Sequence, residues 1–102
     1  MPGPFPINIP PFPGLAYLSS EAIASFASAV GFSSIPATAQ VATLSIEGGN
    51  VRWGTATVLP TGDAGAPVWG TSIVTINRTM FSSIRFINMT GSTATGTVNY
   101  YG

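Results

Sequence analysis

The feature that most constrains this chain is how few of its side chains are ionised. Among its 102 residues three are Lys or Arg, three are Asp or Glu, and none is His or Cys. An average soluble domain carries a charge on about a quarter of its residues. Polarity comes instead from 12 Thr and 11 Ser, and Thr favours strands. We expect a surface that is covered by other subunits, because charge is what keeps a lone domain soluble. The alternative explanation of the Thr content is a β-protein whose strands simply favour Thr.

The missing residue types exclude several function classes. The length fits one domain. Without Cys there is no disulfide framework or thiolate zinc site, and without His there is no Ser-His-Asp or Cys-His catalysis. No Lys follows a glycine cluster, which excludes a phosphate-binding P-loop. Glu47 and Asp63 could form a glycosidase pair, but nothing in their spacing requires it. We therefore expect no enzyme activity, no metal and no cofactor.

Charge and hydropathy also argue against two classes of partner. The formal net charge is zero and no basic cluster is present, so binding to nucleic acid is disfavoured. The most helix-like stretch, residues 15–32, contains Glu21 and many Ser and Ala residues. It is too short and too polar to cross a bilayer. We expect neither nucleic acid nor a membrane as a partner.

The N-terminal arm, residues 1–14, holds six of the nine prolines. Because proline fixes φ and lacks an N–H, the arm is expected to be extended or polyproline-like. Apolar side chains alternate with the prolines and form candidate interface anchors: Phe5, Ile7, Ile9 and Phe12. The arm has two possible receptors, its own domain or a neighbouring subunit.

Residues 15–36 are expected to contain a short helix followed by a linker. Glu21 would lie in the first turn of this helix, after a serine cap. Ile23, Phe26 and Val30 have the spacing of one helical face, and a glycine follows them as a stop signal.

Residues 37–102 are expected to form a β-domain. Gly48 and Gly49 predict a two-residue hairpin turn, in which Ile46 pairs with Val51. The alternation then gathers the apolar side chains of both strands on one face: Leu44, Ile46, Val51 and Trp53. A shift of one residue would destroy this agreement.

Four further strands are expected at residues 54–59, 72–77, 84–90 and 96–101, separated by turn-rich segments. The predicted fold class is therefore mainly β, a small antiparallel β-sandwich or jelly-roll-like barrel. The extended arm and the one short helix would precede it.

Two aromatic residues complete the candidate interface. Trp69 follows a proline at a loop exit, where it is either a core residue or an exposed anchor. Tyr101 ends the chain beside Tyr100, and one of the two must point outward. Exposed Trp and Tyr also serve as stacking platforms for sugars, so a carbohydrate-binding or adhesion module is the alternative function.

Several segments together resemble small virion proteins of tailed bacteriophages. They are residues 46–53 (IEGGNVRW), 60–62 (PTG), 83–87 (SIRFI) and 98–101 (VNYY). The resemblance covers residues 37–101 and leaves the arm outside. Gly54 and Thr55, which follow the first segment, depart from the more polar, charged turn expected there.

This resemblance implies a non-enzymatic, β-rich subunit of the virion. The type it favours is a capsid decoration (cement) protein, with a tail or fibre component also possible. It implies assembly in the host cytoplasm and a place on the outer capsid surface. The partners would be the major capsid protein and copies of the chain itself, a trimer being one natural symmetry. Apolar contacts of the arm would then strengthen the shell.

Overall fold

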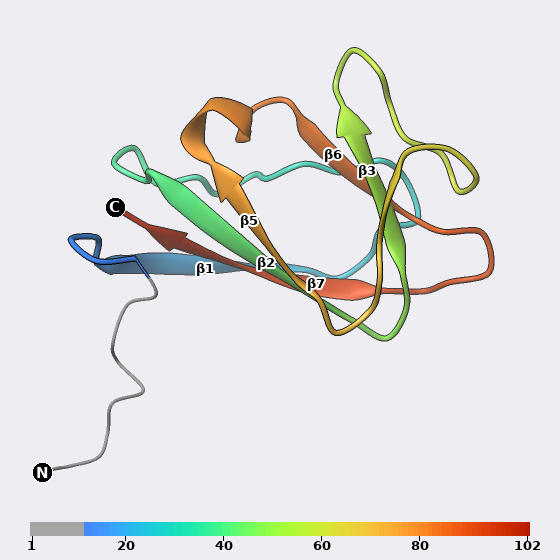
Figure 1. The fold of residues 1–102 in the computed structure, drawn as a ribbon, viewed down its shortest axis with the longest axis horizontal. Coiled ribbons are helices and arrows are strands. Elements are labelled where there is room, and N and C mark those ends of the chain that lie inside the picture. The colour runs from blue at the N-terminus through green and yellow to red at the C-terminus, as the bar shows by residue number, and fades with distance from the viewer. Residues whose placement is uncertain (1–11) are drawn as a thin grey trace, which may run out of the picture.

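The computed structural model describes residues 12–102 and shows a β-sandwich of two antiparallel sheets (Figure 1). The four-stranded sheet has the order β1-β7-β2-β5, and the three-stranded sheet has the order β4-β3-β6. The strands are β1 (Tyr17–Ile23), β2 (Val41–Glu47), β3 (Val51–Thr55), β4 (Ala66–Val68), β5 (Ile73–Asn77), β6 (Ile84–Asn88) and β7 (Thr95–Tyr101). The short 3-10 helix η2 (Arg78–Met80) follows β5. The predicted mainly β fold class and the small antiparallel sandwich are confirmed.

The core lies between the inner faces of the two sheets. Strand side chains alternate between the two faces of a sheet, so every second residue of β2 and β7 points inward. Seven large side chains are fully buried: Tyr100, Phe26, Phe86, Leu44, Ile46, Val51 and Val98. Every buried side-chain nitrogen and oxygen among residues 12–102 has a hydrogen-bond partner.

Phe32 connects the aromatic side chains of this core. Its ring stacks on Phe86 at 6.3 Å and meets Tyr100 edge-on at 5.9 Å and Phe81 at 6.2 Å between centroids. Such pairs each contribute about 0.5–1.5 kcal/mol beyond the area they bury. The loop that carries Phe32 is therefore anchored in the core although it has no regular secondary structure.

The helix predicted within residues 15–36 is wrong. Residues 17–23 form strand β1, which pairs with β7 at the border of the larger sheet. Ile23, Phe26 and Val30 do face the core, but they reach it from a strand and an irregular segment. Main-chain hydrogen bonds to β7 outweigh the helix preference of this Ser- and Ala-rich stretch, whose apolar pattern is sparse.

The predicted hairpin at Gly48 and Gly49 is also wrong. The chain does turn there, with a φ of +80° at Gly48, but β2 pairs with β5 and β7 while β3 pairs with β4 and β6. The turn therefore crosses from one sheet to the other. Such a connection between the two sheets of a sandwich is called an arch. The residues assigned to one apolar face still point into the core, with Trp53 packed at its border, because an arch directs the side chains of its two strands toward each other across the sandwich.

The other strand predictions are closer to the structure. Strands at 73–77, 84–88 and 95–101 match three of the predicted segments. The predicted strand at 54–59 is wrong after Thr55, where the chain folds back. Gly54 permits this, because a Cβ there would lie 2.5 Å from the carbonyl oxygen of Val58.

The crossing between sheets can be tested with cysteine pairs, since the chain has no native cysteine. Ser45 lies opposite Thr97 of β7, at a Cα separation of about 5.5 Å, which suits a disulfide. We expect the double variant Ser45→Cys/Thr97→Cys to oxidise to an intramolecular disulfide, detected by mass spectrometry. The hairpin pairing instead places Ser45 beside Arg52, so rapid oxidation of Ser45→Cys/Arg52→Cys would contradict the arch.

Candidate functional site

The outer face of the four-stranded sheet is the candidate interaction surface of this protein. Its strands present mainly hydroxyl and amide groups to the outside, and Thr and Asn residues lie opposite one another along the register. Glu47, at one end of β2, is the only member with a formal charge. The outer face consists of Tyr17, Ser20, Ala22, Val41, Thr43, Ser45, Glu47, Ile73, Thr75, Asn77, Thr95, Thr97, Asn99 and Tyr101.

The three arginines lie elsewhere and hold loops in place. The Arg52 side chain donates to the carbonyls of Gly62 and Gly65, at 3.2 and 3.0 Å. The Arg78 side chain donates to the carbonyls of Ala37 and Ala39 in the loop before β2. The Arg85 side chain donates to the carbonyls of Ser82 and Ile84, which lie just before it in the chain. Main-chain groups in irregular segments need such partners, so each guanidinium acts as an internal clamp and is directed away from the outer face.

Two of the three carboxylates have the same kind of role. Asp63 accepts a hydrogen bond of 2.8 Å from the Thr90 hydroxyl and so joins two loops. Glu21 points from β1 toward the interior, where its carboxylate accepts a hydrogen bond of 2.5 Å from the hydroxyl of the buried Tyr100. The same carboxylate also accepts hydrogen bonds from the main-chain N–H groups of Ser33 and Ser34, at 2.9 and 3.0 Å. Glu21 thus fastens the loop that follows β1 back onto the sheet.

This clamp shifts the pKa of both of its ionisable members. Burial of Glu21 raises the pKa of its carboxyl, but the hydrogen bonds from Tyr100, Ser33 and Ser34 outweigh this and hold the pKa below its ordinary value of 4.5. Burial, together with the neighbouring carboxylate, raises the pKa of the Tyr100 phenol. At neutral pH the Glu21 carboxyl is therefore ionised, the Tyr100 phenol is protonated, and the phenol donates a hydrogen bond to the carboxylate.

An aromatic corner, formed by Phe12, Tyr17 and Tyr101, stands at one end of the outer face. The rings of Phe12 and Tyr101 meet edge-on at 5.3 Å, and those of Tyr17 and Tyr101 at 6.1 Å. The Tyr17 hydroxyl shares a 2.7 Å hydrogen bond with the Ser20 hydroxyl, which donates to the side-chain oxygen Oδ1 of Asn99 at 2.5 Å. This corner fixes the start of the described chain against its end.

The structure brings together only part of the predicted interface. Phe12 and Tyr101 are in contact at the aromatic corner, whereas Phe5, Ile7 and Ile9 lie outside the described residues. Trp69 is an exposed residue, 59% accessible, in the turn before β5. That turn bonds to Ile46 near the far end of β2, and Tyr101 pairs with Val41 at its beginning. Five residues of strand separate the two, which is about 17 Å.

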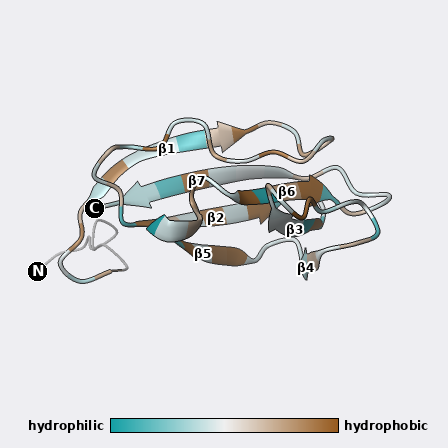
Figure 2. Cartoon of the chain, turned by 90° about the horizontal axis from the view of Figure 1, so that it is seen from above, coloured by the Kyte–Doolittle hydropathy of each residue, from teal (hydrophilic) through white to brown (hydrophobic). Residues whose placement is uncertain are grey.

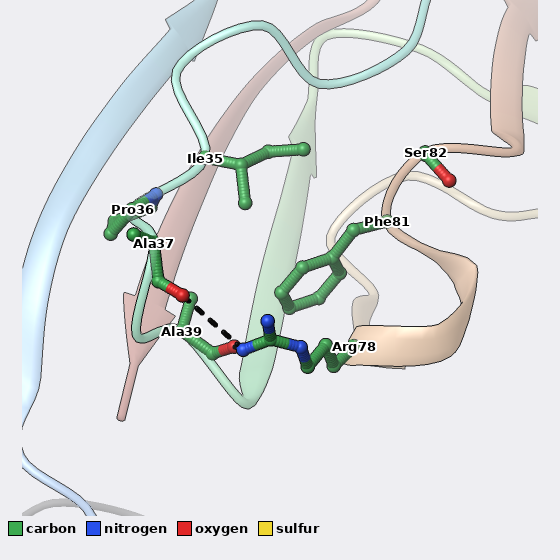
Figure 3. A pocket seen from close by; sticks show the side chains of 7 residues that line it. All are labelled: Ile35, Pro36, Ala37, Ala39, Arg78, Phe81 and Ser82. Atoms are coloured by element: carbon green, nitrogen blue, oxygen red, sulfur yellow. Dashed lines mark hydrogen bonds between the residues drawn. The ribbon is translucent and has the colours of Figure 1, made fainter.

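A shallow pocket lies next to the start of β2 and the end of β5. Its volume is about 260 Å³. Figure 3 shows the loop before β2 on one side and η2 with Phe81 on the other, and the Arg78 guanidinium bonds the Ala37 and Ala39 carbonyls between them. The lining is Ile35, Pro36, Ala37, Ala39, Arg78, Phe81 and Ser82. The pocket therefore offers mainly apolar contacts, and its one charged group, the Arg78 guanidinium, is already bonded to the two carbonyls.

The described part of the chain shows neither a metal cluster nor a membrane helix. Within residues 12–102 no three His, Cys, Asp or Glu side chains come close enough to hold a metal ion. No helix in the same range is long and apolar enough to cross a bilayer. Comparison with protein-family models, with curated proteins and with solved structures found no match.

Sequence reasoning missed the outer face as a unit. The Thr residues of β2, β5 and β7 are visible in the sequence, but which strands lie side by side depends on long-range pairing. The roles of Glu21 and the arginines were also missed. The arginines bond main-chain carbonyls, which leave no signal in a sequence, and Glu21 bonds loop N–H groups and the Tyr100 hydroxyl, which is 79 residues away along the chain.

The Glu21 clamp gives a pH-dependent stability. Because the folded pKa is depressed, the carboxylate stabilises the fold above its unfolded value of 4.5, and this contribution is lost as the pH falls through and below that value. We expect Glu21→Gln to lower the free energy of unfolding by about 1–2 kcal/mol at pH 7. The difference from the wild type should shrink at pH 3, measured by urea unfolding.

Glu47→Gln is the matched control, because Glu47 is exposed at the end of β2. It should change stability by less than about 0.5 kcal/mol at pH 7. An effect of Glu21→Gln that stays the same at pH 7 and pH 3 would show that the carboxylate charge is not what stabilises this loop.

Proposed function

We propose that this protein is a non-enzymatic structural subunit of a virion, a decoration (cement) protein on the capsid of a tailed bacteriophage. The observation that carries the proposal is the outer face, a broad sheet surface with Glu47 as its only formal charge. A surface that remains exposed to water is expected to carry many charges of both signs. A permanently covered one tends to exclude them, because each unpaired charge costs several kcal/mol when desolvated.

The hydroxyl and amide groups of this face suit a tight protein contact. Thr, Ser and Asn side chains can both donate and accept hydrogen bonds, so they can pair with a partner's polar groups without salt-dependent charge pairing. The proposed partner is an equally neutral surface of the major capsid protein. Two of the segments that carry the resemblance to phage virion proteins overlap strands of the sandwich: residues 84–87 lie in β6 and residues 98–101 in β7.

Carbohydrate binding is the alternative, and the geometry favours it less. A sugar platform needs an aromatic face next to several polar groups. Trp69 and Tyr101 are at opposite ends of β2, and the Tyr101 ring already packs edge-on against Phe12 and Tyr17. A glycan array that retains the chain at micromolar concentration would favour this alternative over a shell contact.

A charge in the middle of the outer face should weaken binding to the particle. Thr97 is exposed at the centre of β7, so Thr97→Lys leaves the core intact but introduces a cation to be desolvated. Phage particles made without the chain are incubated with purified protein, and the bound fraction is measured after sedimentation. We expect binding at least about tenfold weaker than wild type, which corresponds to about 1.4 kcal/mol.

Val58→Lys is the control, because Val58 is 74% exposed in the loop after β3, on the other sheet. It should bind like the wild type. Equal binding of Thr97→Lys and wild type would rule out the outer face as the docking surface, and failure of the wild type to sediment with particles would overturn the proposed function.

The apolar arm is proposed to add to this contact. Deleting residues 2–11 keeps Phe12 at the aromatic corner, so the domain should stay folded, with an unchanged melting temperature. Binding of this variant to particles should fall, because the deletion removes Phe5, Ile7 and Ile9. Wild-type binding by the shortened chain would show that the arm is not a clamp.

A further inference from the structure

Within residues 12–102, β5 is the one border strand of the sandwich that has no protection against pairing with another chain. Borders expose unpaired main-chain groups and invite pairing with another chain, so proteins protect them with charge, proline, bulges or a covering segment. β5 reads Ile-Val-Thr-Ile-Asn, without charge or proline, and its first residue, Ile73, is 68% exposed. Figure 2 shows β5 at one border of the four-stranded sheet and β1 at the other.

The other three borders are each protected. β1 has a register shift near its start and carries the inward-pointing Glu21. β4 is three residues long with Pro67 at its centre. β6 is covered by the loop that follows β1, because Val30 and Phe86 exchange two main-chain hydrogen bonds of 2.9 Å. This contrast makes the bare edge of β5 a specific feature and not a general property of the fold.

The hydrogen-bond pattern shows which main-chain groups of β5 are free. The Arg78 N–H donates to Gln40, and the Ser72 carbonyl accepts from Ile46. In the antiparallel register the even-numbered residues of β5 are therefore those that bond to β2. Main-chain groups alternate in direction along a strand, so the N–H and C=O of Ile73, Thr75 and Asn77 point to the open edge.

A second copy of β5 fits this edge. Placed antiparallel about a two-fold axis through Thr75, it sets Thr75 opposite its own copy and Ile73 opposite Asn77. All three edge-facing residues then exchange two hydrogen bonds with their partner. The chain's own arm is a poorer occupant, because five of its residues between 2 and 11 are prolines, which have no N–H to donate.

No charge opposes this pairing. The nearest charged residue on the chain is Arg78, and its guanidinium donates to the Ala37 and Ala39 carbonyls on the β2 side. Pairing would also cover the exposed Ile73 side chain. We propose that two copies of this protein associate through β5 into one continuous sheet centred on Thr75. The two outer faces then lie on the same side and form one double-width surface.

The first test is the mass of the chain in solution. Sedimentation equilibrium up to about 500 µM should give the wild type twice the 10.4 kDa of one chain, with micromolar affinity because the contact is small. Thr75→Lys should give the mass of one chain, and Thr97→Lys, on the same face but away from the edge, should stay paired. A monomeric wild type, a trimer, or a Thr75→Lys variant that remains paired would overturn the proposal.

The second test fixes the register and does not depend on how a lysine is tolerated. Thr75→Cys should form an intermolecular disulfide under mild oxidation, because its Cα lies about 5.5 Å from that of its copy. Ile73→Cys alone should not, since four residues of strand offset the two copies by about 13 Å. Mixing Ile73→Cys with Asn77→Cys should restore the cross-link. Equal cross-linking of Thr75→Cys and Ile73→Cys would contradict the two-fold pairing.

The mass and cross-linking tests are independent of particle binding. If Thr97→Lys loses binding to particles but remains a dimer, the result supports docking through the outer face and, separately, pairing through β5. A monomeric wild type that still binds particles would remove the pairing and leave the proposed function standing.

Discussion

The structure depends on a small number of ionised side chains that hold main-chain groups of loops. The Glu21 carboxylate accepts two loop N–H groups, and the guanidinium of Arg52 reaches two loop carbonyls. A seven-stranded sandwich with long connections has many main-chain groups that no strand satisfies, and each must find a partner when it is shielded from water. Here charged side chains supply those partners.

This use of charge explains the neutral outer face. Hydrogen bonds to an ionised group are about twice as strong as neutral ones, so a few such groups can order several loops. The same groups are then not available to solvate the surface. The four-stranded sheet consequently exposes Thr, Ser and Asn side chains, which suit contact with another neutral surface, and the border strand β5 has no charge that would repel a second copy.

The prediction of the fold class from the sequence succeeded because alternation is a local property. Leu44, Ile46 and Val51 were correctly expected in the core, and the strands at 73–77, 84–88 and 95–101 follow from β-branched and aromatic runs between turns. The candidate site was predicted less well. Phe12, Tyr101 and Trp69 were named one by one, but their grouping depends on the order of strands in the sheet, and Phe5, Ile7 and Ile9 lie outside the described residues.

The sequence by itself determined that the chain is mainly β, that Leu44, Ile46 and Val51 point inward, and that little charge is available for the surface. Only the tertiary structure decided that the turn at Gly48 crosses between sheets and that residues 17–23 form a strand. The reason is physical: a hairpin and an arch place the same side chains in the core, so the local pattern cannot distinguish them. Pairing with β7, which is nearly the whole chain away from β1, decides the conformation of residues 17–23.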